Sequence, residues 1–160
     1  MSYTHEQIEQ AIAEWQKRLR MQDWEFRVGW DEEPEGEYAL ASIEQVDGRR
    51  LALIRFCREH IESAAPADLS LTIAHELLHM VLVPLDNAVD LALNGASNER
   101  VLLVRRQAHY ANEIVTDSLA AAFCRAYGPP DCLLDEPLRV TEWTHAPTRQ
   151  EACFFMPTAG

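Results

Sequence analysis

Apolar residues recur along the first thirty positions at two different spacings, and each spacing predicts a different element. In residues 5–21 they return every three or four positions, as on one face of an amphipathic helix. Thr4 precedes this segment and is a residue type that caps helices. In residues 24–30 apolar and polar residues alternate strictly. This alternation predicts a half-buried strand directly after the helix.

Two further strands are predicted from the next apolar segments. Residues 38–46 and 51–56 are rich in residues that favour strands, and Asp47-Gly48 lies between them. An Asp-Gly pair between two such segments is typical of a tight hairpin turn. We therefore expect these two strands to pair in antiparallel fashion, within a small antiparallel or mixed sheet of about three strands.

Residues 67–83 are apolar on nearly every side, which predicts a buried helix. Asp68 or Ser70 is expected to cap its start, and Pro84 is expected to end it. After a connection with a short helical turn at residues 88–93, a long helix is predicted from about Ser97 to Gly128.

The elements together predict an α+β protein with one domain, residues 1–130, followed by an extended C-terminal tail, residues 131–160. Apolar residues make up 48% of the 160 residues, enough for a hydrophobic core. The longest apolar run is interrupted by ionisable side chains, so no membrane span is expected.

The net charge and the cysteine spacing argue against two classes of function. The net charge of −12 disfavours binding to nucleic acid, whose phosphates are also negative. The four cysteines are widely spaced and form no CxxC pair, which excludes a zinc-ribbon site. Because the first residues also lack a signal-peptide pattern, we expect a cytoplasmic protein with free thiols.

The buried helix carries the motif with the most specific chemistry, His75-Glu76-Leu77-Leu78-His79. Two histidines four positions apart lie one turn apart on the same helix face, where both imidazoles can hold one Zn²⁺ ion. Glu76 follows the first histidine and lies about 100° around the helix, where it can take a proton from a water held by the metal. Three ionisable side chains on a buried helix need partners, and a metal ion provides one.

A catalytic zinc site usually has a third protein ligand. The best candidate is Glu113 on the long helix, with Asp117 one turn further along the same face. Asp117 can accept the second ring N–H of a ligating histidine and so fix its tautomer. Asp86 or Asp90, shortly after the motif, remains an alternative third ligand.

The HExxH motif followed by Glu113 and Asp117 in an ExxxD pattern resembles the gluzincin metallopeptidases. The short spacing and the order of elements are similar to the compact members, the minigluzincins and the ImmA/IrrE-type peptidases. This resemblance covers about residues 24–127. It implies a zincin-like fold in which one Zn²⁺ is held by two histidines and a glutamate, and a peptide or protein substrate.

The resemblance also implies that the strand before the motif helix forms the rim of a substrate cleft, where an extended peptide adds to it. In this sequence that strand comprises Leu51, Ala52, Leu53, Ile54, Arg55 and Phe56. Gluzincins also use a Tyr or His to stabilise the oxyanion, and the candidates are His109, Tyr110 and His145.

The expected function is peptide hydrolysis at a zinc site in which Glu76 is the general base. The tail offers a regulatory alternative, since Cys153 or His145 could supply a fourth ligand and keep the site latent. A phage-type or prophage-type regulatory protein that retains the fold, a structural zinc domain and a hydrolase of non-peptide amides also remain open. The sequence predicts no oligomeric state.

Overall fold

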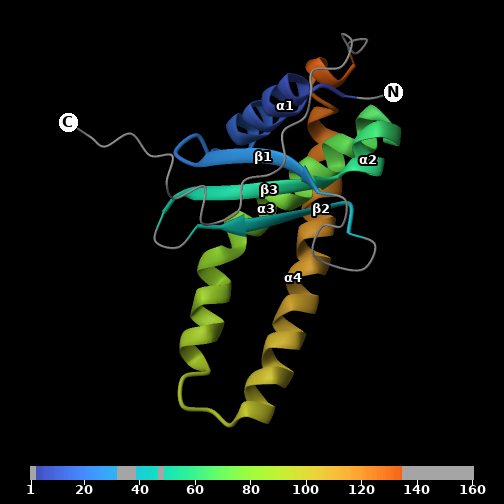
Figure 1. Ribbon diagram of the computed structural model, residues 1–160. Helices are drawn as coiled ribbons and strands as arrows, with labels where there is room; N and C mark the ends of the chain where they lie inside the picture. The colour runs from blue at the N-terminus through green and yellow to red at the C-terminus, as the bar shows by residue number, and fades with distance from the viewer. Residues whose placement is uncertain (1–2, 32–38, 47–48, 135–160) are drawn as a thin grey trace, which may run out of the picture.

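The computed structural model describes residues 3–31, 39–46 and 49–134 (Figure 1). The described residues form four α-helices, a three-stranded mixed sheet and a short 3-10 helix, which confirms the α+β class. In chain order the elements are α1 (His5–Arg18), β1 (Glu25–Asp31), β2 (Ala41–Gln45), β3 (Leu51–Cys57), α2 (Arg58–Ser63), α3 (Pro66–Ala92), α4 (Asn98–Tyr127) and η1 (Asp131–Leu133).

The sheet has the strand order β1-β3-β2, with β1 parallel and β2 antiparallel to β3. The predicted antiparallel pairing of β2 with β3 is confirmed, and in its register Ile43 lies opposite Ile54. The predicted turn at Asp47-Gly48 lies outside the described residues.

The prediction that a peptide adds to residues 51–56 is wrong, because such addition requires a strand at the edge of the sheet. β3 is the central strand and is paired on both sides. Its residues Leu51, Ala52, Leu53, Ile54 and Phe56 are almost fully buried. A nearly continuous apolar run is typical of a strand covered on both faces, which agrees with the burial of β3.

The core lies between the sheet and the two helices α1 and α3. Thr4 caps α1 as predicted, through a reciprocal capping box with Gln7. Trp15 of α1 is completely buried, and its Nε1 donates to Ser70 Oγ of α3 at 3.1 Å. Ser70 therefore joins the two helices rather than capping α3. The helix begins at Pro66, after the N-cap residue Ala65, which makes no side-chain cap.

The motif helix is longer than predicted, because α3 continues through Pro84 to Ala92. A proline inside a helix removes one backbone hydrogen bond and clashes with the preceding turn, at a typical cost of about 3 kcal/mol. The helix nevertheless continues, and beyond Pro84 it contacts α4 through the Asp86–Asn112 hydrogen bond and the Asp90–Arg105 ion pair. The predicted helical turn at 88–93 is therefore the last part of α3.

Beyond the sheet, α3 and α4 run side by side in opposite directions and project from the body of the molecule (Figure 1). We call residues 84–111 the helical arm. The predicted long helix is present as α4, and it ends at Gly128, whose φ of +69° is readily adopted only by glycine.

The chain after α4 packs onto α1. Gln7 Nε2 donates to the Cys132 carbonyl at 3.0 Å, and Leu133 is buried. The first residues of the predicted tail therefore belong to the folded body. Residues 135–160 lie outside the described part of the chain.

By length and composition α3 could cross a membrane, whereas the sequence pattern predicted no such segment. Nine of its residues are buried, and they all lie between Leu69 and Met80. A buried core helix satisfies the same criterion, so this is weak evidence for a membrane span.

Candidate metal centre

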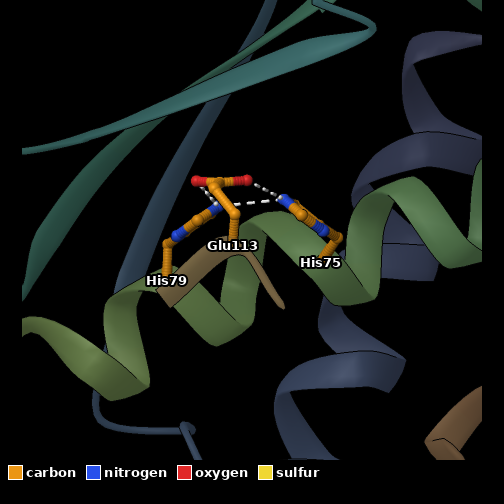
Figure 2. Close-up of side chains that lie close together, drawn as sticks. All are labelled: His75, His79 and Glu113. Carbon is orange, nitrogen blue, oxygen red and sulfur yellow. Dashed lines mark hydrogen bonds and ion pairs between the residues drawn. The ribbon is translucent and has the colours of Figure 1, made fainter. Parts of the chain in front are cut away.

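Two helices bring the predicted ligands together (Figure 2). His75 and His79 lie one turn apart on α3, and their Nε2 atoms are 2.9 Å apart. Glu113 comes from the neighbouring helix α4. Its Oε2 lies 3.5 Å from His75 Nε2, and its Oε1 lies 3.5 Å from His79 Nε2. The three side chains point toward one another and can hold a metal ion.

The donor atoms of these three side chains are arranged to bind one metal ion. Asp117 Oδ1 lies 2.9 Å from His75 Nδ1, and this contact places the proton of a neutral imidazole on Nδ1. The lone pair of His75 Nε2 then points toward the other two ligands. Ligand atoms of a tetrahedral zinc site lie about 3.3 Å apart, given bonds of about 2.0–2.1 Å. The two Nε2 atoms are 2.9 Å apart, and each lies 3.5 Å from a different oxygen of Glu113, so the two histidines and this carboxylate are close enough to share one ion.

Glu76 lies beside this group and is only 7% exposed. Burial, reinforced by the nearby negative charge of Glu113, raises the pKa of its carboxyl to about 7. A bound dication would favour the carboxylate and lower this pKa again. Burial also lowers the pKa of His79 and so favours the neutral imidazole that a metal requires.

The side chains of His75, His79 and Glu113 line a cleft of about 790 Å³. One wall is formed by α3 and α4, and the other by residues 39–43, at the start of β2. No residue of β3 lines this cleft. The strand next to the site is therefore β2, and the predicted rim at 51–56 lies behind it in the centre of the sheet.

Of the other predicted site residues, His109 and Tyr110 are largely exposed, and His145 and Cys153 are not described. His109 lines the cleft, and its Nδ1 is 3.7 Å from Glu113 Oε1, but its side chain is 76% exposed. Tyr110 is 68% exposed and is not part of the cleft wall. His145 and Cys153 lie outside the described residues.

Neither alternative third ligand joins the metal group. Asp86 lines the cleft and accepts a hydrogen bond from Asn112 Nδ2, but it does not belong to the group whose donor atoms lie close enough to share one ion. Asp90 pairs with Arg105 at 2.9 Å. Within the described residues, His75, His79 and Glu113 form the one group arranged to hold a metal.

Sequence reasoning missed two features of the site. It did not identify the start of β2 as a wall, although a short strand with polar residues is a typical edge strand. It also assigned no role to Asn112, which is 8% exposed and contacts Asp86 from the opposite helix. A polar residue on the apolar side of a helix was the available signal.

No family model matches the chain, and no curated protein or solved structure matches it significantly. The interpretation of the site therefore depends on its residues and their geometry. The geometry establishes a group of two histidines and one glutamate that can hold a metal ion and that lines a cleft.

Proposed function

We propose that this protein is a zinc-dependent metallopeptidase. The observation that carries the proposal is the convergence of His75, His79 and Glu113 at one point, with the buried Glu76 beside them. A structural metal site would need no such carboxylate. Three protein ligands also leave one coordination position for water or substrate, as in catalytic zinc sites.

The donor set supports zinc as the metal. Two imidazole nitrogens and one carboxylate oxygen form a ligand combination that zinc hydrolases use. Calcium and magnesium prefer sites made of oxygen ligands alone. The contact between Asp117 and His75 Nδ1 is also of the kind that orients zinc-ligating histidines.

The side chains have distinct roles in this proposal. Bound zinc would lower the pKa of water and polarise the scissile carbonyl. Glu76 accepts the proton of the attacking water and passes it to the leaving amine. Burial raises its pKa to about 7 in the metal-free chain, so uptake of the proton by the Glu76 carboxylate, which gives the neutral acid, is favourable. Asp117 keeps His75 in the tautomer that presents Nε2 to the metal.

The outer edge of β2 supports a peptide as the substrate. The Cys57 N–H donates to the Leu40 carbonyl at 2.8 Å, and the Val46 N–H donates to the Leu51 carbonyl at 2.8 Å. In an antiparallel ladder the residues between them alternate in direction. Ala41, Ile43 and Gln45 therefore direct their N–H and C=O groups away from β3.

No described strand pairs with this outer edge of β2. Because the start of β2 also lines the cleft, an extended peptide can add to it as a fourth strand and present a bond to the metal. The proposed substrate rim is thus β2, in place of the strand expected from the sequence.

The test combines metal analysis with cleavage of a peptide library by the full chain. We expect about one zinc per chain in the wild type and in Glu76→Gln, with cleavage lost by a factor of 100 or more (roughly 10²–10⁴) in the variant. His79→Ala should lose both zinc and cleavage. Equal cleavage by wild type and Glu76→Gln would refute the proposed role of Glu76, and absence of stoichiometric zinc would refute the metal site.

The helical arm favours one second candidate function, that of a regulatory protein that binds a protein partner and has little proteolytic activity. Leu91 and Leu102 are 75% and 70% exposed, and Leu85 and Leu103 are more than half exposed. Exposed apolar side chains that gather on one projecting element are typical of interaction surfaces. A zinc-loaded chain that cleaves no peptide would favour this function over peptide hydrolysis.

A further inference from the structure

A second, smaller cavity of about 230 Å³ lies between α3 and α4 at the base of the helical arm. His79, Asp86 and His109 line both this cavity and the metal cleft. The two spaces therefore meet at these three side chains. A substrate that lies in the metal cleft can extend one group into the smaller cavity.

Asp86 is held in position at this junction. It lies two turns after His79 on the same face of α3, because the helix continues through Pro84. From the opposite helix, Asn112 Nδ2 donates to Asp86 Oδ1, and Asn112 itself is 8% exposed. A carboxylate has two oxygens with about four acceptor positions, so this contact leaves capacity for a ligand.

Two aspartates line this cavity, and of these Asp86 is the one that is not paired with an arginine. The carboxylate of Asp90 is paired with Arg105 at 2.9 Å, which neutralises that wall. Among the described residues, no lysine or arginine forms an ion pair with Asp86. Val89 and Ala108 supply apolar surface between the polar groups. This combination suits an aliphatic stem that ends in a positive charge.

We propose that this cavity is a substrate subsite that binds an ammonium or guanidinium group close to the scissile bond, with Asp86 as its counter-ion. The inference rests on the proposed peptidase function and names its substrate class, peptides with a cationic group. The group can be a Lys or Arg side chain, or the free amino terminus of a peptide. The buried amide of Asn112 orients the carboxylate toward that group.

The first test uses two peptide mixtures, one with free and one with acetylated amino termini. Mass spectrometry of the products maps the cleavage sites in each mixture. We expect Lys and Arg to be enriched about tenfold at one fixed position relative to the cleaved bond. Asp86→Asn keeps the size of the side chain and should remove this enrichment, a loss of about 1.4 kcal/mol of discrimination. Cleavage confined to the first bond of peptides with free termini would identify the amino terminus as the occupant instead.

The matched control is Glu99→Gln, which removes one negative charge from the exposed first turn of α4, outside both cavities. It should leave the cleavage preference unchanged. If peptides are cleaved without a cationic preference, or if Asp86→Asn has the same preference as the wild type, the inference is wrong and the peptidase proposal stands.

The second test does not depend on cleavage. In ¹⁵N-labelled, zinc-loaded protein the side-chain amide signals of Asn112 should shift when Nα-acetyl-lysine amide is added, and not with Nα-acetyl-norleucine amide. Asp86→Asn should weaken this binding about tenfold. If no peptide is cleaved but the signals shift in this way, the peptidase proposal fails and the cation site is supported. If the two amides act alike, the cation site is refuted.

Discussion

The buried carboxyl of Glu76 predicts a specific pH dependence of stability in the metal-free protein. Its pKa rises from an ordinary value of 4.5 to about 7 in the folded chain, first because it is buried and second because Glu113 is near. The folded state therefore favours the neutral acid. The contribution of this group to stability is fully present below about pH 4.5 and is lost as the pH rises through about 7.

The magnitude follows from the pKa change. One pKa unit corresponds to about 1.36 kcal/mol, so a rise from 4.5 to about 7 corresponds to about 3 kcal/mol. Glu76 is 7% exposed, so solvent screening reduces this value little. A loss of this size is a large part of the 5–15 kcal/mol that typically stabilises a protein.

Glu76→Gln removes the charge and retains the shape. In chelator-treated protein, the variant should match the wild type near pH 4.5 and become more stable by about 3 kcal/mol at pH 8. For a chain of this size that difference raises Tm by about 6–12 °C. Thermal unfolding followed by circular dichroism at several pH values measures it.

Two comparisons make this prediction refutable. The exposed Glu99→Gln variant should show no such pH-dependent gain. Saturating zinc should reduce the advantage of Glu76→Gln, because a nearby dication stabilises the carboxylate of the wild type. The same difference in Tm at pH 5 and pH 8 in metal-free protein would refute the reasoning about a buried charge.

Three further predictions concern the metal site, the rim and the core. Asp117→Asn should weaken zinc binding about tenfold, as measured by competition with a chromophoric chelator. This is the lower end of the usual range for residues that orient a ligating histidine, because the Asp117 side chain is 73% exposed. Ile43→Pro should abolish cleavage while Ile43→Ala reduces it little, because only proline removes the outward N–H of β2; equal activity of the two variants would argue against strand addition. Leu53→Ala should cost about 2–5 kcal/mol in urea unfolding, since Leu53 is fully buried in the central strand, and a cost below 1 kcal/mol would contradict that placement.

Local patterns were sufficient to predict most of the elements. The spacing of apolar residues after Thr4 predicted α1 and its cap, and the strict alternation from residue 24 predicted β1 to within one residue. These signals involve only near neighbours in the chain. The end of α3 was predicted wrongly, because the helix continues beyond Pro84, where Asp86 and Asp90 contact side chains of α4, a helix that begins at Asn98.

The order of strands depended on contacts that no local pattern contains. The segment at 51–56 was correctly predicted as a strand paired with the one before it. Its second, parallel pairing with β1 places it in the centre of the sheet. β2 therefore lies at the edge of the sheet, and its first residues form a wall of the cleft.

By itself the sequence determined the ligand types and their spacing on each helix, because His75 and His79 share one helix face whatever surrounds them. It could not determine how the two helices meet. Only tertiary packing brings Glu113 within 3.5 Å of both histidines and places Asn112 against Asp86. The physical reason is that a helix sets distances between its own side chains, whereas distances between helices depend on how the whole core packs.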